Sequence, residues 1–208
     1  DGNQVIEKIQ ERLLGRYPLH DVKDPKTGEI IVDTNTLITE DIADKIEAPV
    51  SRDIERVRKY WKLIIEIDPS LKDIYGDVSL ADESISVDHF VPWQYVAHDE
   101  LWNLHPTTKS INSSKSNSLP SWSLYFNSLG ELEYRAYELK NQNEIVAREF
   151  QKIAPYHLNN QEIRNQLYED GLDKHSFIGR LEHVVKPVYE SAQMLGFKEW
   201  IYDGGKSI

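Results

Sequence analysis

The sequence contains no cysteine, and this absence removes two classes of structure. Without thiols the chain forms neither a disulfide framework nor a thiolate zinc site, so zinc fingers and zinc ribbons are excluded. A metal ion in this protein must therefore be bound by oxygen atoms or by imidazole nitrogens. No structural zinc is expected.

Basic residues are scarce relative to acidic ones. The chain has 24 Lys and Arg against 35 Asp and Glu, which gives a formal net charge of -11. Non-specific coating of nucleic acid depends on basic side chains that displace counterions from phosphates, so this charge argues against that role. Because exposed charges are screened within about 10 Å, a local basic or metal-bearing groove can still work on an acidic body.

Long apolar runs are also missing, since no stretch approaches the roughly 20 residues that a membrane helix needs. The first residues, DGNQVIEKIQER, lack the basic and apolar regions of a signal peptide, and we expect a cytoplasmic protein without a membrane partner. The 208 residues, 39% of them hydrophobic, suffice for one ordinary core or for a core with a small appendage. An initial Asp in place of Met suggests a processed or partial chain.

Residues 1–48 are predicted to form a small module of a helix, a hairpin and a second helix. Apolar residues recur at helical spacing over residues 4–14, and Pro25 and Gly28 then separate two short runs, as in a tight turn. A threonine cap and an acidic first turn open the segment TEDIADKIE, as helices do. Pro49 marks the expected boundary with the rest of the chain.

The segment RLLGRYPLHDVKDPKTGEIIVDTNTLITEDIADKIEA resembles part of the large β′ subunit of bacterial RNA polymerase. The resemblance spans residues 4–48 and then stops, because the cysteines expected next are absent and the sequence continues as PVSRDIERVRKYWKLII. Such a piece carries no catalytic group of its own. The resemblance therefore implies a structural module, a genuine fusion or a mis-joined reading frame.

Residues 49–208 are predicted to form one mostly helical domain around a small irregular site. Helical patterns cover three segments, residues 51–68, 129–153 and 173–197. Gly196 is a suitable C-terminal cap for the last helix, and Pro187 is expected to kink or split it.

The stretch VDHFVPWQYVAHDELWNLHPTTKSINSSKSNSLP, residues 87–120, collects groups suited to metal-dependent chemistry. Asp88 is a hard oxygen ligand of the kind magnesium prefers, and His89 titrates near neutral pH and can take a proton from water. If the pair lies on a strand, the two side chains point to opposite faces. Both can then serve one site only where the strand ends or bends.

Further polar residues follow in the same stretch. Asn103 can hold an imidazole ring in orientation, and Asn112 offers an oxygen to a metal ion. Lys109 and Lys115 are the candidates for contacts with phosphate, the latter one helical turn after Asn112. The plain alternatives are a turn-forming Asn103, a helix-capping Asn112 and two solvated lysines.

These residues resemble the His-Asn-His (HNH) endonuclease motif, in the variant whose last histidine is replaced by asparagine. The spacing is similar to that in the HNH domain of RNA-guided DNA nucleases. The resemblance implies a ββα-metal fold, with strands from SISVDHF and LHPTT, a loop over Val91–Trp102 and a helix entered at INSSKS. The expected class is α+β, a ββα-metal motif embedded in a mostly helical domain after a small N-terminal module.

The resemblance also implies roles for these residues. His89 and Asn103 are the expected catalytic residues, and Asp88 and Asn112 are the expected ligands of Mg²⁺, with Mn²⁺ as an alternative. The expected activity is hydrolysis of DNA, with RNA less favoured, in a defence or mobile-element context and with a homodimer or partner protein for target recognition. The alternative is a catalytically inactive nucleic-acid-binding or protein-interaction module that keeps the scaffold.

Other aromatic and imidazole side chains flank the motif. His98 and His105 match no role in it, so we expect exposed or packing histidines at these positions. Trp93 and Trp102 are expected to belong to the core and to hold the loop down.

Overall fold

The computed structural model describes residues 13–23, 28–81, 84–96, 99–158 and 161–204. The chain divides into two compact units, residues 1–55 and residues 56–208, which are described separately. Across the described ranges, no helix is long and apolar enough to cross a membrane.

The first unit contains the predicted hairpin. Strand β1 (Val22–Lys23) pairs antiparallel with β2 (Ile30–Val32), as the turn signals indicate. Gly28 lies before β2 with a φ of 72°, in the left-handed region that glycine enters without steric cost. Among the described residues of this unit, the buried core consists of Val32, Ile38 and Ala43. Most of the helix predicted over residues 4–14 lies outside the described residues.

Helix α2 (Glu40–Ile67) begins in the first unit and ends in the second. Its first turn carries Glu40 and Asp41, whose negative charges favour a helix N-terminus. The prediction of two helices separated at Pro49 is wrong, because one continuous helix runs through this residue. A proline in a helix interior costs one hydrogen bond and crowds the preceding turn, so the helix-forming residues on both sides must outweigh this cost.

The second unit contains a ββα arrangement. Strand β3 (Ile85–His89) pairs antiparallel with β4 (Leu104–Thr108), and α4 (Lys109–Lys115) follows β4 directly. Thr108 caps α4, since its side chain accepts a hydrogen bond from the backbone N–H of Ile111. The two predicted strands, the helix entry and the α+β class are confirmed.

Short elements connect and flank this motif. They are α3 (Trp93–Val96), the 3₁₀ helix η1 (Leu101–Asn103), β5 (Leu119–Pro120) and β6 (Glu199–Trp200). The last two strands pair in parallel. Trp102 is buried as predicted, whereas Trp93 is only half-buried because it opens a one-turn helix next to the exposed Gln94.

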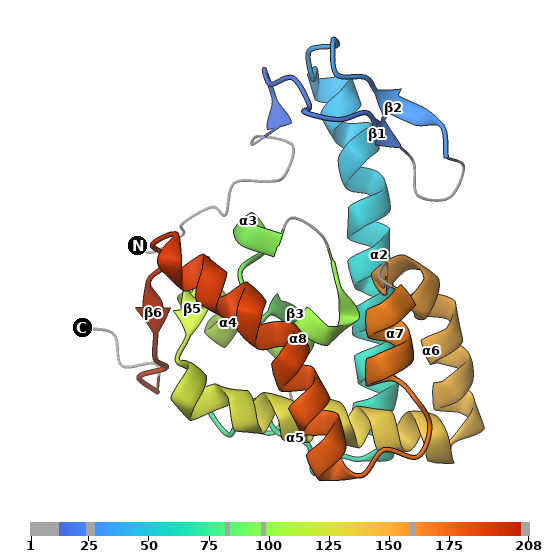
Figure 1. Cartoon of the computed structure of the whole chain (residues 1–208), viewed down its shortest axis with the longest axis vertical. Coiled ribbons are helices and arrows are strands. Elements are labelled where there is room, and N and C mark those ends of the chain that lie inside the picture. The colour runs from blue at the N-terminus through green and yellow to red at the C-terminus, as the bar shows by residue number, and fades with distance from the viewer. Residues whose placement is uncertain (1–12, 24–27, 82–83, 97–98, 159–160, 205–208) are drawn as a thin grey trace. The chain divides into compact units, whose positions relative to one another are not determined.

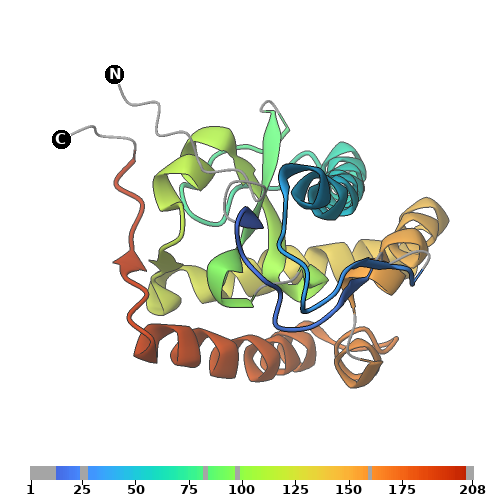
Figure 2. The ribbon, with the colours of Figure 1, turned by 90° about the horizontal axis from the view of Figure 1, so that it is seen from above.

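Longer helices enclose the motif in the described part of the second unit. They are α5 (Trp122–Gln142), α6 (Glu144–His157), α7 (Gln161–Leu167) and α8 (Lys174–Met194). Helix α5 packs against α6 and α8, and α7 packs against α8 (Figures 1 and 2). Pro187 does not split α8, and Gly196 follows its end with a φ of 90°, as a cap does.

The single helix predicted over residues 129–153 is wrong, because the chain breaks at Asn143. This residue has an extended backbone, with φ -127° and ψ 116°. Its side chain accepts hydrogen bonds from the backbone N–H groups of Ile145 and Val146. An asparagine that caps a new helix in this way ends the previous one, although the apolar stripe continues.

The helices hold the ββα motif through specific contacts. The indole N–H of Trp61 on α2 donates to the carbonyl oxygen of Leu104 on β4, at 3.1 Å. Phe90, which follows β3, packs against Trp122 of α5 and Tyr189 of α8 with ring centroids 6.2 Å apart in each case. The ends of both strands are therefore fixed from three helices.

Tyr137 on α5 fixes the loop that leads into α8. Its hydroxyl donates to the carbonyl oxygen of Glu169 at 2.6 Å and accepts from the backbone N–H of Leu172 at 2.9 Å. The residue is only 3% exposed. One side chain thus satisfies two backbone groups of the same loop.

We expect Tyr137→Phe to lower the free energy of unfolding by about 2 kcal/mol, because each lost hydrogen bond is worth roughly 1 kcal/mol. Urea unfolding followed by circular dichroism measures this loss. Tyr134→Phe, which removes the same atom from a half-buried ring on the same helix, is the control and should cost less than about 0.5 kcal/mol. Equal losses for the two variants would contradict the role given to Tyr137.

Candidate active site

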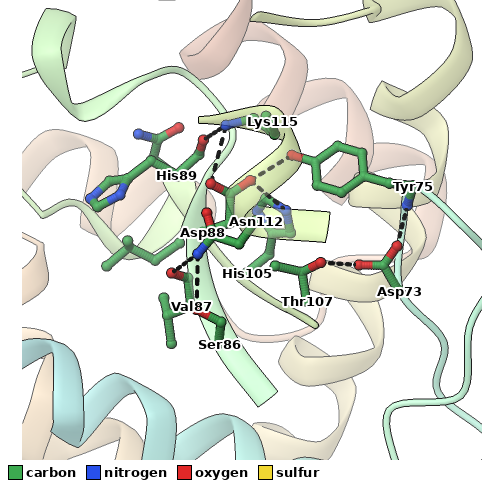
Figure 3. Close-up of polar contacts among 12 residues, drawn as sticks. Asp73, Tyr75, Ser86, Val87, Asp88, His89, His105, Thr107, Asn112 and Lys115 are labelled. Carbon is green, nitrogen blue, oxygen red and sulfur yellow. Dashed lines mark hydrogen bonds and ion pairs between the residues drawn. The ribbon is translucent and has the colours of Figure 1, made fainter. Parts of the chain in front are cut away.

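Asp88 on β3 lies at the centre of a buried polar cluster (Figure 3). Its side chain is 5% exposed, and each carboxylate oxygen accepts one hydrogen bond. Lys115 donates to Oδ1 from its Nζ at 3.1 Å, and Tyr75 donates to Oδ2 from its hydroxyl at 2.9 Å. A cation and a neutral donor therefore both compensate the carboxylate in the interior.

Lys115 is the cation of this cluster. Its side chain is fully buried, and besides Asp88 it donates to the carbonyl oxygen of His89 at 2.7 Å. The sequence predicts a contact between Lys115 and phosphate, but in the structure both hydrogen bonds of the ammonium group go to acceptors inside the protein. Lys115 thus links the end of α4 to Asp88 and His89, the last two residues of β3.

A second layer supports Tyr75. Asp73 accepts hydrogen bonds from the backbone N–H groups of Tyr75 at 2.8 Å and Gly76 at 2.7 Å, and Thr107 of β4 donates to its other oxygen. Burial raises the pKa of Asp73, which these hydrogen bonds oppose. Burial and the charge of Asp88 raise the pKa of Tyr75 well above its usual range, so its hydroxyl stays protonated and donates.

His105 lies opposite Asp88 in the strand pairing and is fully buried. Burial lowers the pKa of its imidazole to about 4, so the ring is neutral near pH 7. Its Nε2 is 3.7 Å from Asp88 Oδ2, too far for a hydrogen bond, and the two do not form an ion pair at that pH. The ring packs edge-on against Tyr75 and Phe90, as expected of a packing histidine. His98 lies outside the described residues.

His89 ends β3, and its ring points away from the Asp88 cluster in Figure 3. The side chain is 18% exposed, and Nε2 lies 2.7 Å from Oδ1 of Asp99, whose side chain is 11% exposed. Sequence reasoning missed Asp99. An acidic residue after the histidine is a weak signal that does not separate Asp99 from Glu100, and only the path of the loop selects between them.

Asn103 is fully buried and fixes the backbone that follows His89. Its side-chain oxygen accepts from the backbone N–H of Val91 at 2.7 Å, and its amide nitrogen donates to the Val91 carbonyl at 2.9 Å. Its own carbonyl accepts from the backbone N–H of Phe90 at 2.9 Å. Asn103 thus acts on the His89 ring through the main chain and not through a contact with the imidazole.

Asn112 projects from α4 towards β3. Its amide nitrogen donates to Ser86 Oγ at 2.8 Å and to the Val87 carbonyl at 3.1 Å. In Figure 3 its amide oxygen points towards the carboxylate of Asp88. Since Thr108 caps α4, the alternative in which Asn112 is the cap does not describe this helix. Lys109, at the start of α4, is exposed.

Asp88 and Asn112 are the two residues that the sequence predicts as ligands of a metal ion. Among the residues that the structure describes, no group of three or more His, Asp or Glu side chains is arranged to hold one. A carboxylate oxygen with one hydrogen bond keeps a further lone pair, and the Asn112 amide oxygen adds a second hard donor. This set fits Mg²⁺ or Mn²⁺, which keep several water ligands. The ammonium group beside Asp88 will weaken that binding by repulsion.

Comparison with known proteins finds similarity in separate parts of the chain. The β′ subunit of DNA-directed RNA polymerase from Moorella thermoacetica is 59% identical over 46 residues, which are 22% of this chain and 4% of that protein. The corresponding subunit from Acetivibrio thermocellus is 48% identical over 58 residues, 28% of this chain and 5% of that protein. The chain therefore spans at most 5% of the length of these two curated relatives. No solved structure matches the chain.

The other similarity lies in the second unit. Residues 73–121 match the family model described as HNH endonuclease. The matched range begins at Asp73 and ends after β5, so it contains the ββα motif and the buried network around Asp88. Both predicted resemblances are thereby confirmed. The match identifies residues 73–121 as a segment similar to HNH endonucleases, and the polymerase likeness is partial.

Proposed function

We propose that the second unit is a divalent-metal-dependent endonuclease that hydrolyses phosphodiester bonds in DNA. The observation that carries this proposal is the end of β3, where a buried carboxylate, Asp88, is followed by a partly exposed histidine, His89. The two residues lie in the segment similar to HNH endonucleases. The ring of His89 points away from the cluster around Asp88 (Figure 3), but the strand ends at this residue, and we place one phosphate between the two side chains.

In this proposal His89 is the general base. It takes a proton from a water molecule while the water oxygen forms a bond to phosphorus and the bond from phosphorus to the 3′ oxygen breaks. The departing 3′ oxygen takes a proton from solvent, and the product carries a 5′ phosphate. A general base contributes typically ~100 to 10,000-fold, so alignment and charge stabilisation must supply the rest of the acceleration.

The remaining residues of the motif bind and position the reactants. Asp88 and Asn112 would hold Mg²⁺ or Mn²⁺, which would supply positive charge beside the phosphate. Asn103 is a positioning residue for His89, and the exposed Lys109 contacts substrate phosphate. Lys115 keeps the Asp88 carboxylate in place through the ion pair at 3.1 Å.

The substrate and context belong to the same proposal. DNA is favoured over RNA because the spacing of the motif is similar to that of RNA-guided DNA nucleases. A cytoplasmic protein of a defence system or mobile element fits such an activity, and a homodimer would allow two nicks in one duplex.

The competing function is an inactive binding module that keeps the scaffold, which the net charge of -11 favours. Nicking of supercoiled plasmid with Mg²⁺, compared with EDTA, decides between them.

The base is tested by His89→Ala. We expect plasmid nicking to fall at least about 100-fold while the fold is retained, because the side chain is partly exposed at the end of a strand. His183→Ala, at an exposed histidine of α8, should nick at the wild-type rate. Wild-type nicking by the His89 variant would remove this residue from the mechanism.

The metal site is tested by Asn112→His. We expect measurable cleavage with a preference shifted from Mg²⁺ towards Mn²⁺ and Ni²⁺, because an imidazole nitrogen replaces an amide oxygen as ligand. Nicking rates with each ion give the preference. Ser113→His places the same ring one residue away on the exposed face of α4 and should leave the preference unchanged. An unchanged preference in both variants would mean that Asn112 only anchors α4 to β3.

The boundary between the two modules is tested by deletion of residues 1–48. We propose that residues 49–208 fold and act without them, because the second unit begins at Arg56 and has its own core. Circular dichroism and plasmid nicking of the shortened chain should match those of the whole chain. Aggregation or loss of helical signal would show that the two modules share a core.

A further inference from the structure

We infer that Asp99 is a positioning residue that fixes the tautomer and the orientation of His89. This inference rests on the proposed function and adds a residue to the same site. The observation is the 2.7 Å distance between Asp99 Oδ1 and His89 Nε2, made by two side chains that are 11% and 18% exposed. A charge-assisted hydrogen bond this short and this shielded from water holds its partner firmly.

The chemistry of the pair assigns the two ring nitrogens of His89. A carboxylate can only accept, so the neutral ring carries its proton on Nε2 and donates it to Asp99. The lone pair is then on Nδ1, which is the nitrogen that receives the proton of the attacking water. When it does, the ring becomes a cation, and the Asp99 carboxylate stabilises that charge without taking a proton itself.

Asp99 is held in turn by the helical part of the second unit. His157, in the last turn of α6, is 1% exposed and has its Nδ1 2.9 Å from the carbonyl oxygen of Asp99. Because a carbonyl only accepts, His157 Nδ1 donates this hydrogen bond. The backbone of Asp99 is thus fixed by a buried side chain that belongs to a different element.

The loop between β3 and β4 is therefore fixed at two points. Asn103 binds both backbone groups of Val91 near its start, and His157 binds Asp99 further along. The Asp99 carboxylate, from the same loop, accepts the hydrogen bond of the His89 ring. The two side-chain torsions of His89 are in this way restricted to one orientation of the imidazole, which is what proton transfer to a defined position requires.

Asp99→Asn is the kinetic test, because it keeps the size of the side chain and removes its charge. We expect kcat for plasmid nicking to fall roughly 100-fold or more, with KM for DNA within about threefold of wild type, since the amide cannot hold the ring in the required tautomer. Asp170→Asn, at an acidic residue paired with Lys140 on the surface, is the matched control and should change neither value. A kcat within about threefold of wild type in Asp99→Asn would overturn the inference.

The pairing is also tested without activity, by ¹⁵N and ¹H NMR of the histidine rings at about pH 8.5, where an ordinary imidazole is neutral. The wild-type chain should show an Nε2-bound proton of His89 that exchanges slowly with water, assigned by its absence in His89→Gln. Asp99→Ala should lose this signal. An undetected proton in the wild type, or an unchanged one in Asp99→Ala, would overturn the inference. Failure of every metal ion to support nicking by the wild type would instead overturn the proposed function, and the NMR result would still decide the pairing.

Discussion

The buried ion pair between Lys115 and Asp88 is the interaction on which the rest of the site depends. Two charges taken out of water are costly, and the loss of one partner from such a pair typically costs about 3–5 kcal/mol because the other is left uncompensated. Here the carboxylate has a second donor, Tyr75, and the ammonium has a second acceptor, the His89 carbonyl. Each charged group therefore has two hydrogen-bond partners, and the pair joins α4 to β3, which are in contact.

This pair also constrains how the site can bind a metal ion. A divalent cation on Asp88 must share the carboxylate with an ammonium group at 3.1 Å, so the free protein should bind it weakly. In the proposed function, a DNA phosphate would bring negative charge to the same place and offset the repulsion. Metal and substrate are then expected to strengthen each other's binding, which is a coupling of two ligands through local electrostatics.

The two units differ in the size of the hydrophobic core that their described residues form. The described core of the first unit is three residues, Val32, Ile38 and Ala43, whereas the second unit buries aromatic side chains from four long segments. Among the described residues, the hydrogen bonds and ion pairs of the cluster around Asp88 come from residues 73–115. The proposed chemistry therefore depends on residues of the second unit.

The sequence by itself determined the order of the functional elements. The resemblance to the HNH motif, which depends only on the order and spacing of residues along the chain, implied a strand that ends at Asp88 and His89, a second strand over LHPTT and a helix carrying Asn112. Tertiary structure decided which groups meet. Lys115 turns inward, and Asp99 reaches His89 with its backbone held by His157, 58 residues away in the chain. It also decided that α2 continues through Pro49 and that Asn143 separates α5 from α6. Spacing along a chain fixes the face of an element on which a side chain lies, but a partner on another element is fixed only when the packed core brings the two together.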